Sequence, residues 1–323
     1  MVRIIDATLT MLDDYMVTAA QAQRFLELLL EIGIDGAAVS PEIYKLLGGK
    51  MPERMTGYLE LPGMPAECKE YPGIQYIIST YCSGIGRCIQ NHQINELAEL
   101  KGIPTEDPTK RFRLTGLDDL LTYESERIYD RAMEELVKIA PILYPENAYY
   151  CATAIAVSYL QRFNGGTVMT TFTGIGSKAA TEQVIAAMRV MQRHKPNQDL
   201  TGLKKLRQLF EEMTGTAVDD HAPVIGERIF YVESGIHVDG VLKKPSNYES
   251  YPPEMVGACR EIILGKHSGK ASVRYKLNAL GLDEAEYDKA RILGQVKRLS
   301  IKKGKDVTDQ EFLEIAGRCR NNA

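Results

Sequence analysis

The alternation of strand-like and helix-like segments at the start of the chain constrains the fold most. Residues 2–9 are apolar enough for a short buried strand, and residues 18–32 carry an apolar stripe at helical spacing. Gly33 ends this helix, residues 34–40 are a second predicted strand, and Pro41 begins a short helix. Strands and helices that alternate over short connections predict a parallel sheet or barrel.

The alternation is interrupted once and then returns. Residues 49–73 contain several prolines and neither a helical nor a strand period, which predicts a long loop. The glycine turn at residues 82–87, before a predicted helix, is either a phosphate cradle or a plain tight turn. Further along we expect three strands and four helices, in chain order at residues 74–80, 111–115, 122–140, 150–163, 167–173, 178–192 and 201–213.

Composition excludes several classes of protein. A net charge of -4 over 323 residues argues against nucleic acid as the main partner. No apolar run reaches the length of a membrane span, and the N-terminus lacks a signal-peptide pattern, so we expect a cytoplasmic protein without a membrane partner. The six cysteines form no CxxC pair, which favours reduced, buried thiols over zinc or disulfides.

Residues 231–270 hold the side chains best suited to chemistry. His237 and Asp239 stand two residues apart between glycines, in the run ESGIHVDG. Lys266 and His267 lie in a second glycine-bracketed run, LGKHSG. Glycines let backbone approach another surface closely, and irregular segments held by a scaffold often carry function, so we expect a turn-like functional segment here.

Several runs together resemble the isopropylmalate and homocitrate synthase family, especially the nitrogen-fixation homocitrate synthases. ESGIHVDG at residues 233–240, NYE at residues 247–249 and LGKHSG at residues 264–269 are similar to that family's linker region. TTFTGIG at residues 170–176 resembles the family strand and loop TTVNGLGERAGN, and DATL at residues 6–9 stands where the family has DTTL. Residues 49–145 do not align.

The resemblance implies a (β/α)8 barrel, a linker subdomain and C-terminal helices. We therefore predict an α/β fold with a degenerate TIM-type barrel at residues 1–215, a small α+β linker subdomain at 216–275, and a helical subdomain at 276–323. Thr308 and Glu311 form a predicted capping box for the last helix. The family condenses acetyl-CoA with a 2-oxo acid, using a divalent metal that polarises the oxo acid's carbonyl.

This chain departs from the family at the metal. The positions of the family's arginine and metal-binding aspartate after the first strand fall on Thr10 and Met11. Its His-x-His pair, expected after the sixth strand, falls on Pro145 and Asn147, and no histidine lies between His92 and His194. Thioether and proline cannot replace carboxylate and imidazole around a hard cation. We therefore predict that this chain binds no cofactor and that a partner subunit supplies the metal.

The length before residue 145 also departs from the family. Six strands at roughly 30 residues per βα unit need about 150 residues, and part of the available length is the irregular segment 49–73. We expect a barrel that has lost about one unit or is completed irregularly. The glycines of the loop at residues 174–176 are similar to those of the family, but the family's asparagine after this loop is Thr181.

Three functions fit this pattern. In the family, the linker histidine reaches into the barrel of a partner, so the chain is interpreted as the omega-type subunit of a split homocitrate synthase that supplies His237 in trans to a metal-competent alpha-type subunit. The first alternative is a pseudoenzyme that stabilises or regulates a full synthase. The second is an independent enzyme with metal-free chemistry, for which no residue of the chain suggests a nucleophile or base.

The remaining candidates keep two interpretations each. Asp239 either orients the imidazole or caps a turn, while Lys266 and His267 either touch the phosphates of CoA or only pack in the glycine turn. Tyr248 is expected at an interface or in the core. The family's histidine before Glu-Ser-Gly is Val232 here, which leaves no second imidazole at that point.

Overall fold

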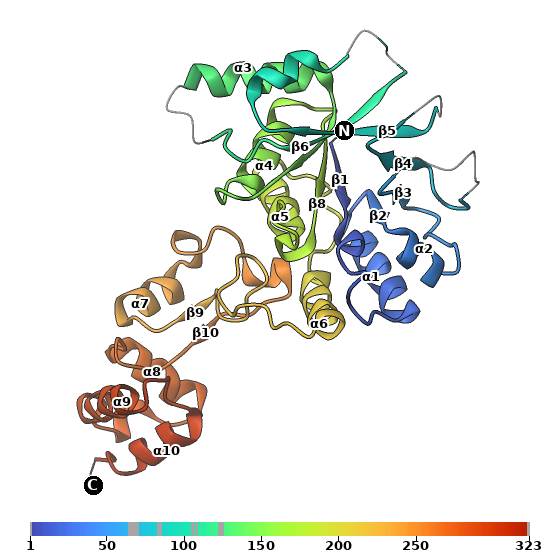
Figure 1. Cartoon of the computed structure of the whole chain (residues 1–323). Coiled ribbons are helices and arrows are strands. Elements are labelled where there is room, and N and C mark those ends of the chain that lie inside the picture. The colour runs from blue at the N-terminus through green and yellow to red at the C-terminus, as the bar shows by residue number, and fades with distance from the viewer. Residues whose placement is uncertain are drawn as a thin grey trace. The chain divides into compact units, whose positions relative to one another are not determined.

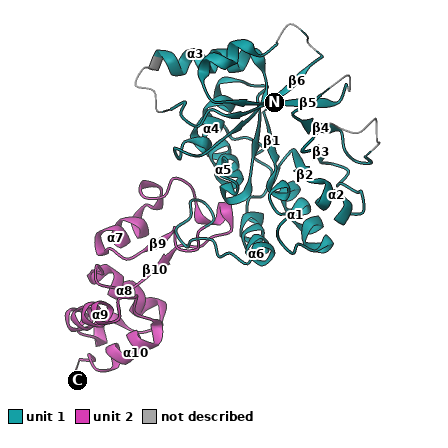
Figure 2. Cartoon of the chain, viewed as in Figure 1, with its two compact units in different colours: residues 1–225 teal, residues 226–323 magenta. Residues whose placement is uncertain are grey.

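The computed structural model describes residues 2–63, 71–82, 86–104, 107, 109–121 and 126–321. The chain forms two compact units, residues 1–225 and 226–323 (Figure 2). The finer division predicted at residue 275 stays a prediction. Among the described residues, no helix combines the length and the apolar character needed to cross a membrane.

The first unit is a closed barrel of eight parallel strands (Figure 1). Each strand pairs with the next in the chain, and the last closes on the first through the register Arg3↔Thr167 to Asp6↔Thr170. The expected α/β barrel is confirmed. The strands are β1 (Arg3–Asp6), β2 (Gly36–Val39), β3 (Thr56–Glu60), β4 (Tyr76–Ser79), β5 (Cys88–Ile94), β6 (Arg111–Gly116), β7 (Ile142–Pro145) and β8 (Thr167–Thr170).

Six α-helices accompany the barrel among the described residues. The first begins at Thr18, whose side chain accepts from the backbone of Gln21 in a capping box, and ends at Gly33, which has a φ of 95°. Its apolar stripe is buried, as its spacing predicts. The helices are α1 (Ala19–Ile32), α2 (Pro41–Leu46), α3 (Glu126–Ile139), α4 (Ala152–Arg162), α5 (Thr181–Gln192) and α6 (Gly202–Thr214), and α6 packs on α1.

The prediction that a strand had been lost is wrong. The segment expected to be a loop contains β3, and the residues expected to open a helix after the glycine turn include β5 instead. The short strand β7 was also missed. Because of these additions, Pro145 ends the seventh strand and not the sixth.

The irregularity of the barrel lies in its helices. Between Glu60 and Tyr76, and between Ser79 and Cys88, the described residues include no α-helix, and β5 is followed only by a 3₁₀ segment at Leu97–Gly102. Strands in a closed barrel satisfy each other's backbone groups, so the sheet survives where the covering helices are absent.

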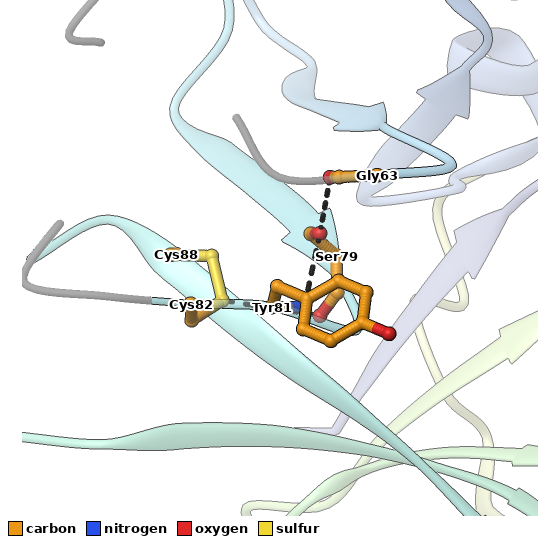
Figure 3. The surroundings of a disulfide bond; sticks show 5 residues. All are labelled: Gly63, Ser79, Tyr81, Cys82 and Cys88. Carbon is orange, nitrogen blue, oxygen red and sulfur yellow. Dashed lines mark hydrogen bonds between the residues drawn. A yellow bond between two sulfur atoms is a disulfide. The ribbon is translucent and has the colours of Figure 1, made fainter. Parts of the chain in front are cut away.

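The prediction of reduced, buried cysteines is wrong for Cys82 and Cys88, which form a disulfide, and for Cys259, which is not buried. Cys82 follows β4, Cys88 begins the adjacent strand β5, and the two form a disulfide with their Cα atoms 5.8 Å apart (Figure 3). Beside it, the Ser79 hydroxyl donates to the Gly63 carbonyl at 2.7 Å. Cys259 is a free, exposed thiol. Residues 83–85, where the phosphate-cradle alternative falls, lie outside the described residues.

The second unit contains a two-stranded parallel sheet and four α-helices among its described residues. The C-terminal helices share an apolar core that includes Leu264, Val296 and Phe312. The predicted capping box of Thr308 and Glu311 is confirmed. The elements are β9 (Tyr231–Val232), α7 (Gly235–Lys243), β10 (Glu261–Ile262), α8 (Lys270–Ala279), α9 (Lys289–Lys303) and α10 (Asp309–Gly317).

Candidate functional site

A cavity of about 370 Å³ lies at the carboxyl ends of the barrel strands. This is the end at which TIM-barrel enzymes place their active sites. Residues that follow β1 and β2, such as Asp13, Ser40 and Glu42, line it together with Glu60 of β3 and Arg113 of β6. Three carboxylates and one guanidinium therefore surround the cavity.

The two positions after β1 where the family has its arginine and aspartate are used for packing. The Thr10 hydroxyl donates to the Ala7 carbonyl at 2.8 Å. Met11 packs against the barrel core and against Gly176, where an added Cβ would lie 2.9 Å from the Met11 sulfur. Neither residue presents a carboxylate to the cavity.

The positions of the family's histidines are occupied by backbone and capping interactions. Pro145 ends β7, and the Asn147 side-chain oxygen accepts from the backbone of Ala152 at the start of α4 (3.0 Å). Thr181 donates to the buried carboxylate of Asp6 at 2.6 Å. Each of these side chains thus holds neighbouring elements together.

A buried ion pair crosses the barrel mouth, and sequence reasoning missed it. The side chain of Arg113 is 4% exposed and donates to both carboxylate oxygens of Glu60, at 2.8 and 2.5 Å. It also donates to the side-chain oxygen of Asn91 at 2.8 Å and lies over the ring of Tyr144 at 5.0 Å. Arg113, a charged residue between Phe112 and Leu114 in the predicted strand, was the available signal for this interaction.

A second ion pair lies over the same aromatic ring. Lys178 contacts Glu146 at 2.8 Å, and its ammonium lies 4.6 Å from the centre of the Tyr144 ring. Gln93 donates to the other oxygen of Glu146 at 3.0 Å. Two cations therefore bind the ring of Tyr144 from within the barrel, where cation–π contacts are strengthened by desolvation.

The residues at this mouth do not fit the family's metal. A hard divalent cation takes carboxylate oxygens and imidazoles, whereas a thioether, a proline and an engaged amide stand at the ligand positions. The described part of the chain also contains no group of three or more His, Cys, Asp or Glu side chains able to hold a metal ion.

In the second unit, His237 lies on helix α7 and not in the expected glycine turn. Gly235 and Gly240 both adopt helical backbone in α7, and the helix buries its apolar residues Val238 and Val241. The imidazole is exposed, and its ring lies 5.6 Å from the ring of Tyr248. Within the described residues, neither ring nitrogen of His237 has a hydrogen-bond partner.

Asp239 does not contact His237 in this structure. Its carboxylate contacts the ammonium of Lys243, one helical turn away, at 2.7 Å, and both side chains are more than half exposed. An i,i+4 pair of this kind stabilises a helix by about 0.2–0.5 kcal/mol. Asp239 therefore does not orient the imidazole of His237 in this structure. It does not cap a turn either, because it lies within helix α7.

The two glycine-rich runs meet through their backbones. A Cβ on Gly235 would lie 2.5 Å from the Cα of Gly269, so only glycines allow this approach. The carboxylate of Glu233 accepts from the backbone of His267 at 2.7 Å. The side chains of Lys266 and His267 remain exposed. The glycines thus serve packing, which places Lys266 and His267 beside the start of α7.

The comparisons with known proteins point to one family. Residues 224–304 match the family described as homocitrate synthase post-HMGL domain-like. The chain is 37% identical over 169 residues to the homocitrate synthase omega subunit of Clostridium pasteurianum, covering 52% of this chain and 47% of that protein. It is 35% identical over 194 residues to homocitrate synthase AksA of Methanothermobacter thermautotrophicus, covering 59% and 49%. It is 32% identical over 233 residues to the 2-phosphonomethylmalate synthase of Streptomyces rubellomurinus, covering 70% and 61%.

The chain spans about half the length of the first two of these relatives. Among solved structures, a hydroxymethylglutaryl-CoA lyase from Pseudomonas aeruginosa aligns with a TM-score of 0.43 at 12% identity, covering 67% of this chain and 93% of that one. A likeness of this size supports no conclusion, and the barrel is established by its strand pairing. The sequence matches confirm the resemblance that the motifs indicate: the chain is similar to the isopropylmalate and homocitrate synthase family, including a homocitrate synthase omega subunit.

Proposed function

We propose that this chain is an omega-type subunit of a homocitrate synthase, which lends His237 to an active site whose barrel belongs to an alpha-type subunit. The observation that carries the proposal is the exposed imidazole on α7, whose ring nitrogens have no hydrogen-bond partner within the described residues. Because the imidazole is exposed and bonded to no other group of its own unit, both of its nitrogens are available to a partner or a substrate.

His237 suits proton transfer during a condensation. Imidazole changes its charge near neutral pH, so it can both take and return a proton there. In the proposed reaction, a proton leaves the methyl group of acetyl-CoA, the new carbon–carbon bond forms at the carbonyl carbon of 2-oxoglutarate, and the carbonyl oxygen gains a proton. Hydrolysis of the thioester then releases CoA and homocitrate. A divalent metal in the partner would polarise the carbonyl that is attacked.

The charges at the mouth of this chain's own barrel favour an active site on another chain. Among the described residues that line this mouth, the one guanidinium, Arg113, is already bound by Glu60, and Asp13 and Glu42 add further negative charge. A 2-oxo dicarboxylate would meet like charges at these residues, which is unfavourable at short range. We infer that the reaction does not take place in this barrel.

The partner and the substrate class rest on the relatives. Both relatives that match with the highest significance carry the name homocitrate synthase, and one of them is an omega subunit. We propose that an alpha-type subunit with an intact set of metal ligands completes the enzyme, and that acetyl-CoA and 2-oxoglutarate bind at the shared site. Such a chain belongs to a hetero-oligomer and, by the resemblance, to nitrogen fixation.

The test is reconstitution. The purified chain, a metal-competent alpha-type barrel subunit, and the co-expressed complex are assayed for CoA release from acetyl-CoA with 2-oxoglutarate and, separately, with 2-oxoisovalerate and pyruvate. We expect turnover from the complex with 2-oxoglutarate and none from this chain alone. Turnover by the isolated chain would refute the split-enzyme proposal, and turnover only with another oxo acid would refute the substrate.

A further inference from the structure

A second cavity, of about 230 Å³, lies at the opposite end of the barrel, where the strands begin. Its walls come from the starts of β1, β6, β7 and β8 and from Tyr58 and Tyr76 of the neighbouring strands β3 and β4. Pockets for drug-sized ligands begin at about 300 Å³. This cavity is therefore large enough only for a small molecule.

Among the described residues, the lining of this cavity contains three cations and no carboxylate. Arg3, Lys110 and Arg111 line it, and within the described residues neither arginine forms an ion pair. Two described carboxylates outside this lining already have partners. Asp35 contacts Lys195 at 2.7 Å and accepts from a backbone N–H of β1, and the half-buried Asp107 accepts from Thr109.

The hydroxyl of Tyr58 is available in the same cavity. Tyr58 lines the cavity and is only 3% exposed. Among the described residues its phenol oxygen is bonded to no other side chain or backbone group, so it can donate to a ligand. Its ring stacks on Tyr76 at 5.3 Å, and Arg111 lies over the Tyr76 ring at 4.7 Å, so both rings are held in place.

The protonation state of Tyr58 makes its hydroxyl a donor. Burial raises the pKa of Tyr58 to about 12, and Tyr76 adds to the rise, while the positive charges of Arg3 and Arg111 act in the opposite direction. The hydroxyl therefore keeps its proton at neutral pH.

The carboxyl end of α3 also reaches this cavity, through Ile139 and Ala140. A helix end of this kind carries about half a negative charge, which falls off within one turn. Three full positive charges outweigh it. The electrostatic potential of the cavity is therefore positive.

We propose that this cavity binds a small oxyanion with two or more negative charges, either a phosphate or a polycarboxylate, through Arg3 and Arg111 and a hydrogen bond donated by Tyr58. Two guanidiniums provide the planar donor geometry that both anions accept. The site lies at the end of the barrel away from the strand carboxyl ends, so it acts independently of the condensation chemistry proposed for His237.

The test is calorimetric titration of the full chain with inorganic phosphate and with citrate at constant ionic strength, with chloride as the monovalent reference. We expect saturable binding of one equivalent of phosphate or citrate, and no saturable binding of chloride. Tighter binding of phosphate would assign the site to phosphoryl groups, and tighter binding of citrate would assign it to carboxylates. Absence of saturable binding for both anions would overturn the proposal.

Variants separate this site from general charge attraction. Tyr58→Phe removes one hydrogen bond to a charged group and should weaken binding about tenfold, and the double variant Arg3→Gln/Arg111→Gln should abolish saturation. Lys302→Gln/Lys305→Gln removes the same net charge from exposed positions in the second unit and should bind as the wild type does. The assignment would be refuted if the control variant lost as much anion affinity as the site variants, or if both site variants bound with wild-type affinity. Circular dichroism of each variant checks that the barrel is folded.

Discussion

Replacing Glu60 by alanine should destabilise the barrel strongly, because it leaves the buried guanidinium of Arg113 without its carboxylate partner. Arg113 is 4% exposed and loses both of its strongest hydrogen bonds in Glu60→Ala. It keeps its contacts with Asn91, the sulfur of Met169 and the ring of Tyr144. Removing one partner of a buried ion pair typically costs 3–5 kcal/mol. Since the side chain of Glu60 is itself 29% exposed, we take the lower end, about 3 kcal/mol.

Urea unfolding followed by circular dichroism and tyrosine fluorescence measures this loss, since the chain has 17 tyrosines and no tryptophan. The transition of the barrel unit should move to lower urea. Glu53→Ala, which removes an exposed carboxylate of the same barrel, is the matched control and should stay within about 0.5 kcal/mol of the wild type.

The double variant Glu60→Leu/Arg113→Met distinguishes an ion pair from a packing defect. Replacing both charges by apolar groups of similar size is often neutral or stabilising. We therefore expect the double variant to be more stable than Glu60→Ala by at least about 2 kcal/mol. A loss below about 1 kcal/mol in Glu60→Ala, or a double variant as unstable as the single one, would refute the claim that this pair closes the barrel mouth.

Three further substitutions test other parts of the fold. Burial raises the pKa of Glu182 to about 7. The protonated carboxyl therefore stabilises the folded state fully below its unfolded pKa, and this stabilisation is lost as the pH rises through 7. In urea titrations from about pH 5 to 8, Glu182→Gln should not lose stability in this way and should be about 1–3 kcal/mol more stable than the wild type near pH 8. Gly235→Ala places a Cβ 2.5 Å from the Gly269 backbone and should lower the free energy of unfolding, measured by heat, by about 1–3 kcal/mol. The control Gly317→Ala, whose Cβ would meet no atom within 4 Å, should leave it unchanged. Equal destabilisation by the two variants would contradict the packing argument. Thr308→Ala removes the capping box of α10 and should cost about 1 kcal/mol, with Thr308→Ser restoring most of it.

The regular part of the barrel could be predicted from the sequence because its signal is local. Strands β1 and β8 are short and carry paired apolar residues at their centres. Helix α1 carries a capping residue, an apolar stripe and a terminal glycine in the expected order. The same locality explains the success with the capping box of α10. Each of these signals depends on neighbours within one or two turns.

The missed strands depend on partners far along the chain. The strand β5 is polar and half-exposed, and its Asn91 is used by Arg113 of the next strand, a pairing that no local pattern reveals. The disulfide likewise needs β4 and β5 to lie side by side, because Cys82 and Cys88 have no CxxC spacing. Counting residues per βα unit underestimated the strands, because the described residues between β3 and β5 contain no α-helix where the estimate assumed one.

The candidate site divides in the same way. The motif around His237 was visible as a pattern, but its helical conformation was not, since glycines at residues 235 and 240 suggest a turn. The reason for these glycines is tertiary. Gly235 faces Gly269, and Gly240 faces the hydroxyl of Tyr248, where an added Cβ would lie only 2.1 Å away.

The rate of CoA release by the reconstituted complex, with His237→Ala in place of the wild-type chain, tests the central claim most directly. If His237 transfers a proton in the partner's active site, kcat should fall by about 10²–10⁴ while the complex still assembles in size-exclusion chromatography. His221→Ala removes another exposed imidazole outside the motif and should leave kcat unchanged. An unchanged kcat in the His237→Ala complex would contradict the account and leave the chain a structural role only.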